Sequence, residues 1–324
     1  MLALLFPGQG SQQVGMGRDA CADSPAARAV FEEADEALGF ALSKLCFEGP
    51  EEELRQTRNQ QPAILATSMA LLHALRERTA LRPAFVAGHS LGEYSALVAA
   101  GALPLAAAVR LVAARGRFMQ EAVPEGRGAM AAVLGAPPEV VADACARAAA
   151  ELDLVVAPAN YNAPQQTAIA GEKQAVQRAT ELAKQTGASR AVPLAVSAPF
   201  HCALMQPAAE KLAAELAGLR FAAPEPPVVT NVEAEPNAQA GRIAGLLEQQ
   251  VTAPVRFTES VRRLVALGVR SVLEVGPGRV LSGLVARIDR SVSRMGVSSM
   301  EEAAEAAAQL RAQASTERGN RNVA

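Results

Sequence analysis

Short apolar runs typical of buried strands alternate along the chain with longer stretches in which apolar residues recur every three or four positions, as in amphipathic helices. The first predicted strands are Leu2–Phe6 and Phe85–Ala87, and helical patterns cover about 25–46, 61–78 and 105–120. This alternation is typical of an α/β fold with a mainly parallel sheet, because parallel strands are usually joined by crossover helices.

The middle of the chain follows a different order of predicted elements. Between Gly128 and Val196 the patterns read strand, helix, strand, strand, helix, strand. This β-α-β-β-α-β series is the split βαβ arrangement of ferredoxin-like folds. We therefore expect a ferredoxin-like subdomain at residues 128–196, inserted into a catalytic domain formed by residues 1–127 and 197–312. The six elements of the insertion are predicted at 129–134, 138–150, 154–159, 166–171, 173–186 and 188–193.

After the insertion the chain returns to the pattern of the first domain. A strand is predicted at 228–231, a helix at 255–267, and a strand at 271–275, where the first domain would be completed. Gly276-Pro277-Gly278 then opens a short helix. The polar residues 313–324 show no apolar periodicity, so we expect them to form a mobile tail.

Composition narrows the class of function. Half of the 324 residues are apolar and a fifth are charged, which allows a large buried core. The 31 basic residues balance 33 acidic ones, so no overall field attracts nucleic acid or a membrane surface.

No apolar run approaches the roughly 20 residues of a membrane helix, and the N-terminus lacks the basic region of a signal peptide. Four separated cysteines without a C-x-x-C pair favour free thiols in the cytoplasm. We expect a monomer, for want of an interface signal.

The stretch Val86-Ala87-Gly88-His89-Ser90-Leu91-Gly92-Glu93 carries the strongest chemical signal. Its G-x-S-x-G pattern, between a predicted strand and a helical pattern, is typical of a nucleophile elbow, where a sharp turn presents a serine hydroxyl. Ser90 is therefore the candidate nucleophile. Matches of this length also occur by chance in ordinary Gly-Ser turns, so the assignment depends on the rest of the site.

A serine nucleophile needs a base, usually a histidine, and the chain has three histidines. His73 lies in a helical pattern, and His89 is adjacent to Ser90, where neighbouring side chains project in different directions. Elimination favours His201, which stands in a proline-containing segment before a predicted helix. The alternative for His201 is an ordinary histidine on a surface loop.

The base needs an acceptor that orients its ring, and no aspartate occurs between residues 154 and 288. A glutamate such as Glu248 or a main-chain carbonyl could serve, and we favour a carbonyl, which leaves a Ser-His dyad. Oxyanion stabilisation needs backbone N–H donors. The N–H of Leu91, directly after the nucleophile, and that of Gln9, in the glycine-containing loop after the first strand, are the candidates. This loop lacks the spacing of a phosphate-binding loop.

Five segments together resemble the motifs of the malonyl-CoA:acyl carrier protein transacylases, in that family's order and over nearly the whole chain to about Ala312. They are Phe6-Pro7-Gly8-Gln9-Gly10-Ser11-Gln12, Gln61-Pro62-Ala63, Gly88-His89-Ser90-Leu91-Gly92-Glu93, Arg115-Gly116-Arg117-Phe118-Met119-Gln120 and Ser197-Ala198-Pro199-Phe200-His201. The resemblance implies an α/β-hydrolase-like core with a ferredoxin-like insertion, in agreement with the predicted element order. It also implies malonyl-CoA as substrate, acyl carrier protein as partner, and no metal or redox cofactor.

The resemblance assigns the reacting groups. Ser90 corresponds to the acylated serine, His201 to its base, and Gln250 to the glutamine whose main-chain carbonyl orients that histidine. Arg115 corresponds to the arginine that pairs with the free carboxylate of the malonyl group. A guanidinium suits this role because it makes two parallel charge-assisted hydrogen bonds to a carboxylate. Its helical surroundings alone would indicate a solvated arginine.

The resemblance also assigns the residues around the acyl group. Gln9 and Leu91 match the oxyanion donors, and Gln61 and Asn162 match residues that line the pocket. Phe200 corresponds to a bulky residue that favours malonyl over methylmalonyl groups, although a serine stands there in some bacterial members. Such a steric preference is worth about 1–3 kcal/mol.

Two other functions remain open from the sequence. A serine hydrolase acting on esters or thioesters would use the same elbow, but it would gain nothing from a buried Arg115 when the acyl chain is neutral. A catalytically silent module that only binds a carrier protein would not need Ser90, His201 and Arg115 together. We therefore expect ping-pong transfer of a malonyl group through a malonyl-serine ester.

Overall fold

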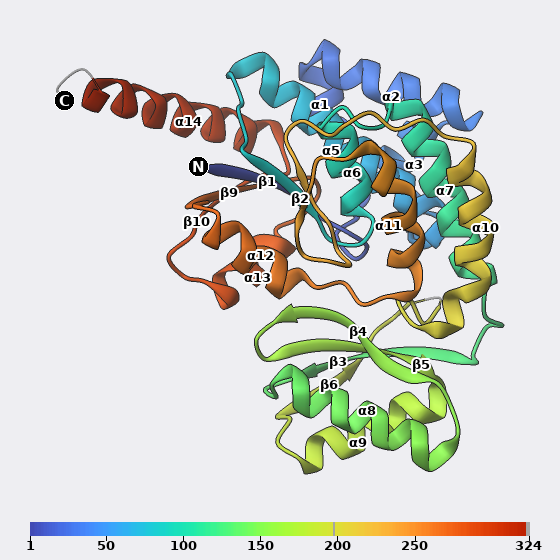
Figure 1. The fold of residues 1–324 in the computed structure, drawn as a ribbon. Coiled ribbons are helices and arrows are strands. Elements are labelled where there is room, and N and C mark those ends of the chain that lie inside the picture. The colour runs from blue at the N-terminus through green and yellow to red at the C-terminus, as the bar shows by residue number, and fades with distance from the viewer. Residues whose placement is uncertain (197, 322–324) are drawn as a thin grey trace.

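The computed structural model of the protein describes residues 1–196 and 198–321, with side chains as far as residue 312. Its strands form two separate sheets, one of six strands and one of four (Figure 1). The larger sheet is almost entirely parallel, and the smaller one is antiparallel. This arrangement confirms the predicted class, an α/β-hydrolase-like core with a mainly parallel sheet and an inserted ferredoxin-like subdomain.

The larger sheet has β1 near its centre. In spatial order its strands are β10 (Ser293–Val297), β9 (Ser271–Val275), β1 (Leu2–Phe6), β2 (Phe85–Gly88), β7 (Val228–Val229) and β8 (Pro236–Asn237). Only the β7–β8 pair is antiparallel. Residues 3–6 of β1 are fully buried, as expected for a parallel sheet covered on both faces. Strand β10 extends the sheet beyond β9, and it was not predicted from the sequence.

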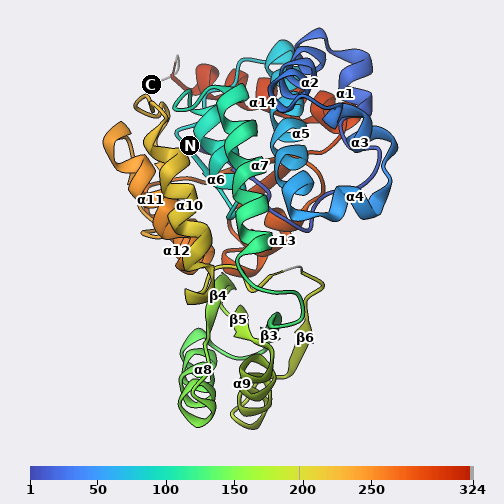
Figure 2. The same cartoon turned by 90° about the vertical axis from the view of Figure 1, so that its right-hand side faces the viewer.

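Helices cover both faces of this sheet. Those before the insertion are α1 (Arg18–Asp23), α2 (Pro25–Leu38), α3 (Leu42–Glu48), α4 (Glu51–Arg55), α5 (Thr57–Arg78), α6 (Gly92–Ala99) and α7 (Leu105–Glu121), and those after it are α10 (Gln206–Ala217), α11 (Ala240–Thr252), α12 (Phe257–Ala266), α13 (Val280–Ile288) and α14 (Met300–Arg321). Figure 2 shows α2, α5 and α7 packed side by side. Within the described residues, no helix is both long enough and apolar enough to cross a bilayer.

Several predicted boundaries differ from the structure. The pattern over 25–46 forms two helices, because Gly39 adopts a left-handed conformation (φ 71°) that ends α2. Helix α5 begins at Thr57 rather than at 61, since Pro62 is accommodated inside a helix that is buried along most of its length. Residues 313–321 continue the backbone of α14, where no helix was predicted, and residues 322–324 of the predicted tail lie outside the described residues.

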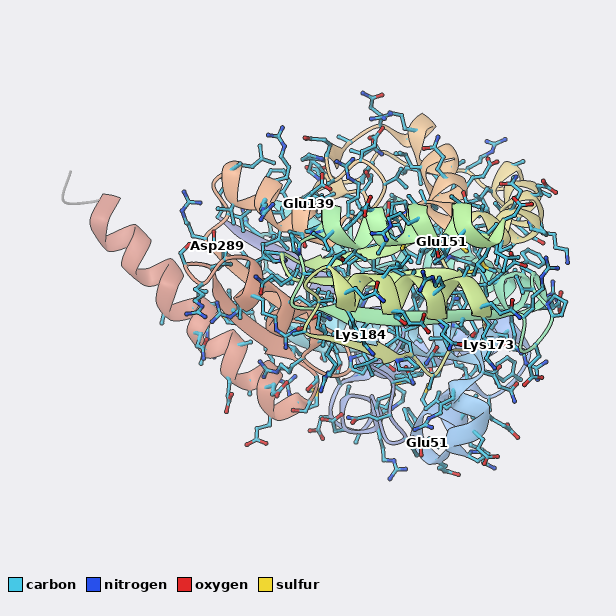
Figure 3. All side chains as sticks on the ribbon, turned by 90° about the horizontal axis from the view of Figure 1, so that it is seen from below. Glu51, Glu139, Glu151, Lys173, Lys184 and Asp289 are labelled. Atoms are coloured by element: carbon cyan, nitrogen blue, oxygen red, sulfur yellow. The ribbon has the colours of Figure 1, made fainter. Side chains whose placement is uncertain are left out.

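The smaller sheet and two helices form the insertion. Its elements are β3 (Gly128–Leu134), α8 (Pro138–Leu152), β4 (Val156–Ala163), β5 (Gln166–Glu172), α9 (Lys173–Gln185) and β6 (Arg190–Pro193). Helices α8 and α9 cover the face of the sheet that points away from the larger domain (Figure 1). Seen from below, Glu151 and Lys173 lie on the outer side of these helices (Figure 3), and Glu151 pairs with Arg178 at 2.6 Å. The division of the chain into a catalytic domain (residues 1–127 and 197–312) and a subdomain (residues 128–196) stays a prediction.

Strand β4 joins the insertion to the larger domain. The Val255 N–H donates to the Ala159 carbonyl at 2.8 Å, and the Tyr161 N–H donates to the Val255 carbonyl at 2.9 Å. Asn160 forms a parallel bridge with Val255. These main-chain bonds fix the C-terminal half of β4, including Asn160 and Asn162, beside the carboxyl ends of the parallel strands.

Candidate active site

The turn between β2 and α6 has the geometry of a nucleophile elbow. Ser90 has a positive φ of 52°, which few residues other than glycine adopt. A Cβ atom on Gly88 would lie 1.9 Å from the Gly92 carbonyl carbon, and one on Gly92 would lie 2.0 Å from the Phe6 carbonyl oxygen. The turn therefore requires both glycines of the G-x-S-x-G pattern.

Asn231 holds this turn from the neighbouring strand. The Ser90 N–H donates to Asn231 Oδ1 at 2.6 Å, and Asn231 Nδ2 donates to the Gly88 carbonyl at 2.7 Å. The predicted strand 228–231 ends at Val229, so Asn231 lies just beyond the carboxyl end of β7, which pairs with β2. Asn231 was not predicted from the sequence, because only the order of strands in the sheet brings it to the elbow.

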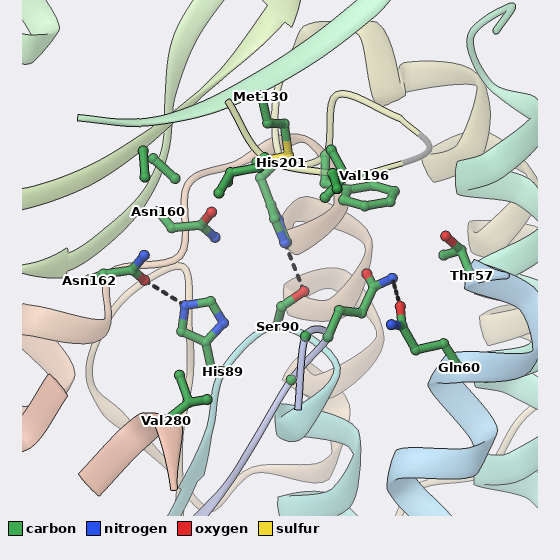
Figure 4. Close-up of a pocket in the computed structure, with 18 of the residues that line it drawn as sticks. Thr57, Gln60, His89, Ser90, Met130, Asn160, Asn162, Val196, His201 and Val280 are labelled. Atoms are coloured by element: carbon green, nitrogen blue, oxygen red, sulfur yellow. Dashed lines mark hydrogen bonds between the residues drawn. The ribbon is translucent and has the colours of Figure 1, made fainter. Parts of the chain in front are cut away.

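Ser90 and His201 point toward each other across the site (Figure 4), with Oγ 2.7 Å from Nε2. His201 Nδ1 lies 2.8 Å from the main-chain carbonyl of Gln250. A carbonyl can only accept, so Nδ1 carries the proton and Nε2 accepts the Ser90 hydroxyl. Glu248, the alternative acceptor, is exposed.

The environment of His201 favours its neutral form. Burial lowers the pKa of His201 to about 3, and the positive charge of Arg115 acts in the same direction. The hydrogen bond to Gln250 opposes this shift without reversing it. Near neutral pH the imidazole is therefore unprotonated and free to accept a proton from Ser90.

Arg115, on α7, is entirely buried, and its hydrogen-bond partners are uncharged side chains. Its Nη1 donates to Gln61 Oε1 at 2.7 Å, and its Nη2 donates to Gln250 Oε1 at 3.0 Å and to Ser90 Oγ at 3.1 Å. Its Nε has no hydrogen-bond partner among the described residues, and its guanidinium carbon lies 5.3 Å from the centre of the Tyr94 ring. A cation held in this way next to a serine hydroxyl is suited to receive an anion.

A cavity of about 540 Å³ opens beside Ser90 and His201, between the two sheets. Gln9, Gln60, Asn162 and Phe200 contribute to its lining. Figure 4 shows two hydrogen bonds in its wall besides the Ser-His contact. His89 Nε2 lies 2.7 Å from Asn162 Oδ1, and Gln9 Nε2 donates to Gln60 Oε1 at 2.6 Å.

Comparison with known proteins decides the family. An acyl transferase domain model matches residues 3–318. The chain belongs to the acyl transferase domain family, and it is an acyltransferase. It is 52% identical, over 286 residues, to the malonyl CoA-acyl carrier protein transacylase of Escherichia coli (strain K12), covering 88% of this chain and 92% of that one. It is 49% identical over 300 residues to the protein of that name in Bacillus subtilis (strain 168), covering 93% and 94%.

Solved structures of similar proteins share the fold of this acyltransferase. The malonyl CoA-acyl carrier protein transacylase from Coxiella burnetii superimposes with a TM-score of 0.93 at 41% identity, covering 95% of this chain and 97% of that one. A malonyl-transacylase solved in complex with its type II PKS acyl-carrier protein gives a TM-score of 0.90 at 47% identity, covering 93% and 97%.

The structure of the acyltransferase brings most of the predicted site residues together. Gln61 is an exception, because it lies fully buried behind the cavity and accepts from Arg115 rather than lining the pocket. Gln60 lines the cavity instead, since consecutive residues of α5 point in different directions. Asn162 lines the cavity as expected, and its contact with His89 was not predicted.

The two predicted oxyanion donors come from adjacent loops. The backbone at Gly8 packs so closely on the elbow that a Cβ there would lie 2.4 Å from the His89 carbonyl oxygen. In the described part of the chain, neither the Gln9 nor the Leu91 N–H donates to another protein atom. Gln9 lines the cavity, so its amide is free to donate to a group bound there, whereas Leu91 is fully buried beside Ser90.

Among the described residues, no group of three or more His, Cys, Asp or Glu side chains is placed so that it could hold a metal ion. The four cysteines are free, and three of them are buried.

Proposed function

We propose that this acyltransferase carries a malonyl group from malonyl-CoA to the phosphopantetheine thiol of an acyl carrier protein, through a malonyl ester of Ser90. The observation that carries the proposal is the Arg115 guanidinium, which is entirely buried, has uncharged partners and donates to Ser90 Oγ. A free carboxylate on the acyl group would complete its hydrogen bonding, whereas a neutral acyl chain would leave the guanidinium without a charged hydrogen-bond acceptor.

The first half-reaction forms the ester. Ser90 Oγ attacks the thioester carbonyl of malonyl-CoA as His201 Nε2 takes the hydroxyl proton. The N–H groups of Gln9 and Leu91 stabilise the oxyanion of the tetrahedral intermediate. The C–S bond then breaks, and the sulfur of CoA leaves with the proton from His201.

The second half-reaction reverses these steps with a different thiol. His201 takes the proton of the phosphopantetheine thiol, and the sulfur attacks the ester carbonyl of malonyl-Ser90. The C–O bond breaks, Ser90 recovers its proton from His201, and malonyl-acyl carrier protein leaves. Arg115 holds the acyl carboxylate through both halves. Ping-pong kinetics follow, because CoA leaves the malonyl-enzyme before the carrier protein reacts with it.

Phe200 supports selection of the malonyl group. Its side chain is 5% exposed, lines the cavity and precedes the base directly. A ring in this place leaves little room for a methyl branch on the α-carbon of the acyl group. We assign it a steric preference for malonyl-CoA over methylmalonyl-CoA.

The proposal extends to the cellular setting of the reaction. The chemistry needs neither a metal nor a redox cofactor, because Ser90, His201 and Arg115 supply the nucleophile, the base and the anion site. A monomer in the cytoplasm that binds neither nucleic acid nor a membrane stays our expectation, and the free cysteines support that compartment. The malonyl-acyl carrier protein product would supply extender units for fatty acid or polyketide synthesis.

The test is to incubate the protein with malonyl-CoA, with and without acyl carrier protein, and to quantify malonyl-acyl carrier protein and free malonate. Transfer that depends on the carrier supports the proposal. Release of malonate at the same rate with or without the carrier would indicate a thioesterase, and no turnover of malonyl-CoA would favour a binding module.

A further inference from the structure

Glu93, at the start of α6, is a buried carboxylate that the proposed mechanism does not use. The residue is 2% exposed. Its Oε2 accepts the side-chain amide of Gln250 at 2.7 Å and the main-chain N–H of Asn231 at 3.0 Å. A carboxyl group is costly to bury, and these partners are neutral donors rather than a cation. Its contacts lead directly to the residues around Ser90.

The Gln250 side chain links Glu93 to Arg115. Its Nε2 donates to Glu93 Oε2 and, at 3.1 Å, to the Ser90 carbonyl, while its Oε1 accepts from Arg115 Nη2 at 3.0 Å. Arg115 can only donate and the Ser90 carbonyl can only accept, so just one orientation of the amide satisfies all three neighbours. An amide turned by half a rotation would present its NH₂ to a guanidinium.

We propose that Glu93 is a positioning residue for Arg115: its Oε2 fixes the Gln250 amide, whose oxygen in turn holds the guanidinium beside Ser90. The inference rests on the proposed role of Arg115 in binding the acyl carboxylate. Loss of the Glu93 acceptor removes one of the contacts that hold the Gln250 amide in place. Gln250 is one of the three side chains that accept from Arg115, so the guanidinium is then held less firmly. The consequence is a weaker selection for carboxylated acyl groups, with the Ser-His pair still in place.

The inference requires an acceptor oxygen at the position of Glu93 Oε2, and this requirement defines the matched variants. Glu93→Gln can keep an acceptor oxygen at the Oε2 position, whereas Glu93→Asp withdraws both oxygens by one methylene and keeps the charge. Glu93→Met removes the acceptor at similar length. Gln250→Met removes the amide but keeps the main-chain carbonyl that accepts from His201.

The experiment measures single-turnover acylation of Ser90 from malonyl-CoA and from acetyl-CoA, and labelling by the neutral serine reagent phenylmethylsulfonyl fluoride as a check on the Ser-His pair. We expect the malonyl-to-acetyl rate ratio to fall about ten-fold in Glu93→Met and Gln250→Met, the worth of one hydrogen bond to a charged group. The double variant should fall no further, because both substitutions break the same chain of contacts. Labelling by the reagent should persist in Glu93→Met.

The conservative variants show whether the acceptor oxygen of Glu93 or its negative charge is needed to hold Gln250. Glu93→Gln should keep the wild-type malonyl-to-acetyl rate ratio, and Glu93→Asp should lower that ratio. This pair still tests the inference if Glu93→Met does not fold. Three results would overturn the inference if the wild type still prefers malonyl-CoA. They are a lowered ratio in Glu93→Gln with an unchanged ratio in Glu93→Asp, an unchanged ratio in Glu93→Met, and additive losses in the double variant. A wild type without that preference would overturn the proposed function and the inference with it.

Discussion

The Nδ1–H of His201 donates to the main-chain carbonyl of Gln250 at 2.8 Å, where a hydrolase triad would place a carboxylate. A neutral acceptor fixes the tautomer of the imidazole but stabilises its protonated form less than an anion does. With Arg115 already beside the site, the histidine is poised as a neutral base. The dyad predicted from the absence of aspartate between residues 154 and 288 agrees with this geometry.

The pH dependence of Ser90 acylation should reflect this environment. Because the pKa of His201 is lowered from 6.5 to about 3, the imidazole stays unprotonated as the pH falls through its ordinary value. We expect the single-turnover acylation rate from malonyl-CoA to stay nearly level between about pH 5 and pH 8. Rapid-quench measurements across this range would check the prediction. A rate that halves near 6.5 would show that His201 titrates as an ordinary histidine.

Substitution of Arg115 should separate malonyl from neutral acyl groups. Arg115→Ala removes the charge-assisted contacts to the acyl carboxylate, so acylation from malonyl-CoA should fall about 100-fold, while acylation from acetyl-CoA should not fall. The matched control is Arg117→Ala, because Arg117 lies on the same helix but is exposed. Equal losses with both acyl donors would assign Arg115 a purely structural role.

Phe200 offers a test of acyl selectivity. Phe200→Ser should open space beside the acyl α-carbon and raise the rate with methylmalonyl-CoA relative to malonyl-CoA by roughly ten-fold, a methylene-scale steric effect. Competition between the two thioesters, read as the masses of the acyl-enzymes, would measure the ratio. An unchanged ratio would show that residues other than Phe200 determine the selectivity between the two acyl groups.

Glu93 should make the stability of the fold depend on pH. Burial raises the pKa of Glu93 from 4.5 to about 7, against the opposing effects of Gln250, Asn231 and Arg115. As the pH rises between these values the unfolded chain ionises first, so the wild type loses stability that a neutral glutamine retains. We expect Glu93→Gln to gain on the order of 2–3 kcal/mol relative to wild type between about pH 5 and pH 8.

Chemical unfolding of both proteins at the two pH values would measure this difference. A gap between Glu93→Gln and wild type that does not change with pH would contradict a raised pKa of Glu93. The acylation profile predicted for His201 is compatible with this titration, because a protonated Glu93 still has a carbonyl oxygen that can accept from Gln250.

Features set by neighbouring residues could be predicted from the sequence. The elbow is such a feature, because the turn at Ser90 requires glycine at 88 and 92 and the strand and helix around it are continuous in the chain. The two-sheet organisation followed from the order of apolar patterns. The boundary of α5 was missed because packing of its buried first turns outweighs the local signal of Pro62.

Features set by the topology of the sheet could not be predicted in the same way. Asn231 and Glu93 are 138 positions apart in sequence, and they meet because β7 pairs with β2. Nothing in the local pattern at either residue marks this contact. Gln250 was placed by resemblance, but the use of its side chain to join Glu93 and Arg115 became visible only in the structure.

Acyl carrier protein should remove a malonyl ester from Ser90, and the mass of the intact protein reports both the ester and its removal. The measurement is intact-protein mass spectrometry of wild type, Ser90→Ala and Arg115→Ala, after brief mixing with malonyl-CoA or acetyl-CoA and then with acyl carrier protein. We expect a malonyl adduct on the wild type alone, cleared when the carrier protein is added. A malonyl adduct on Ser90→Ala, or no adduct on the wild type, would contradict the proposed transfer through Ser90.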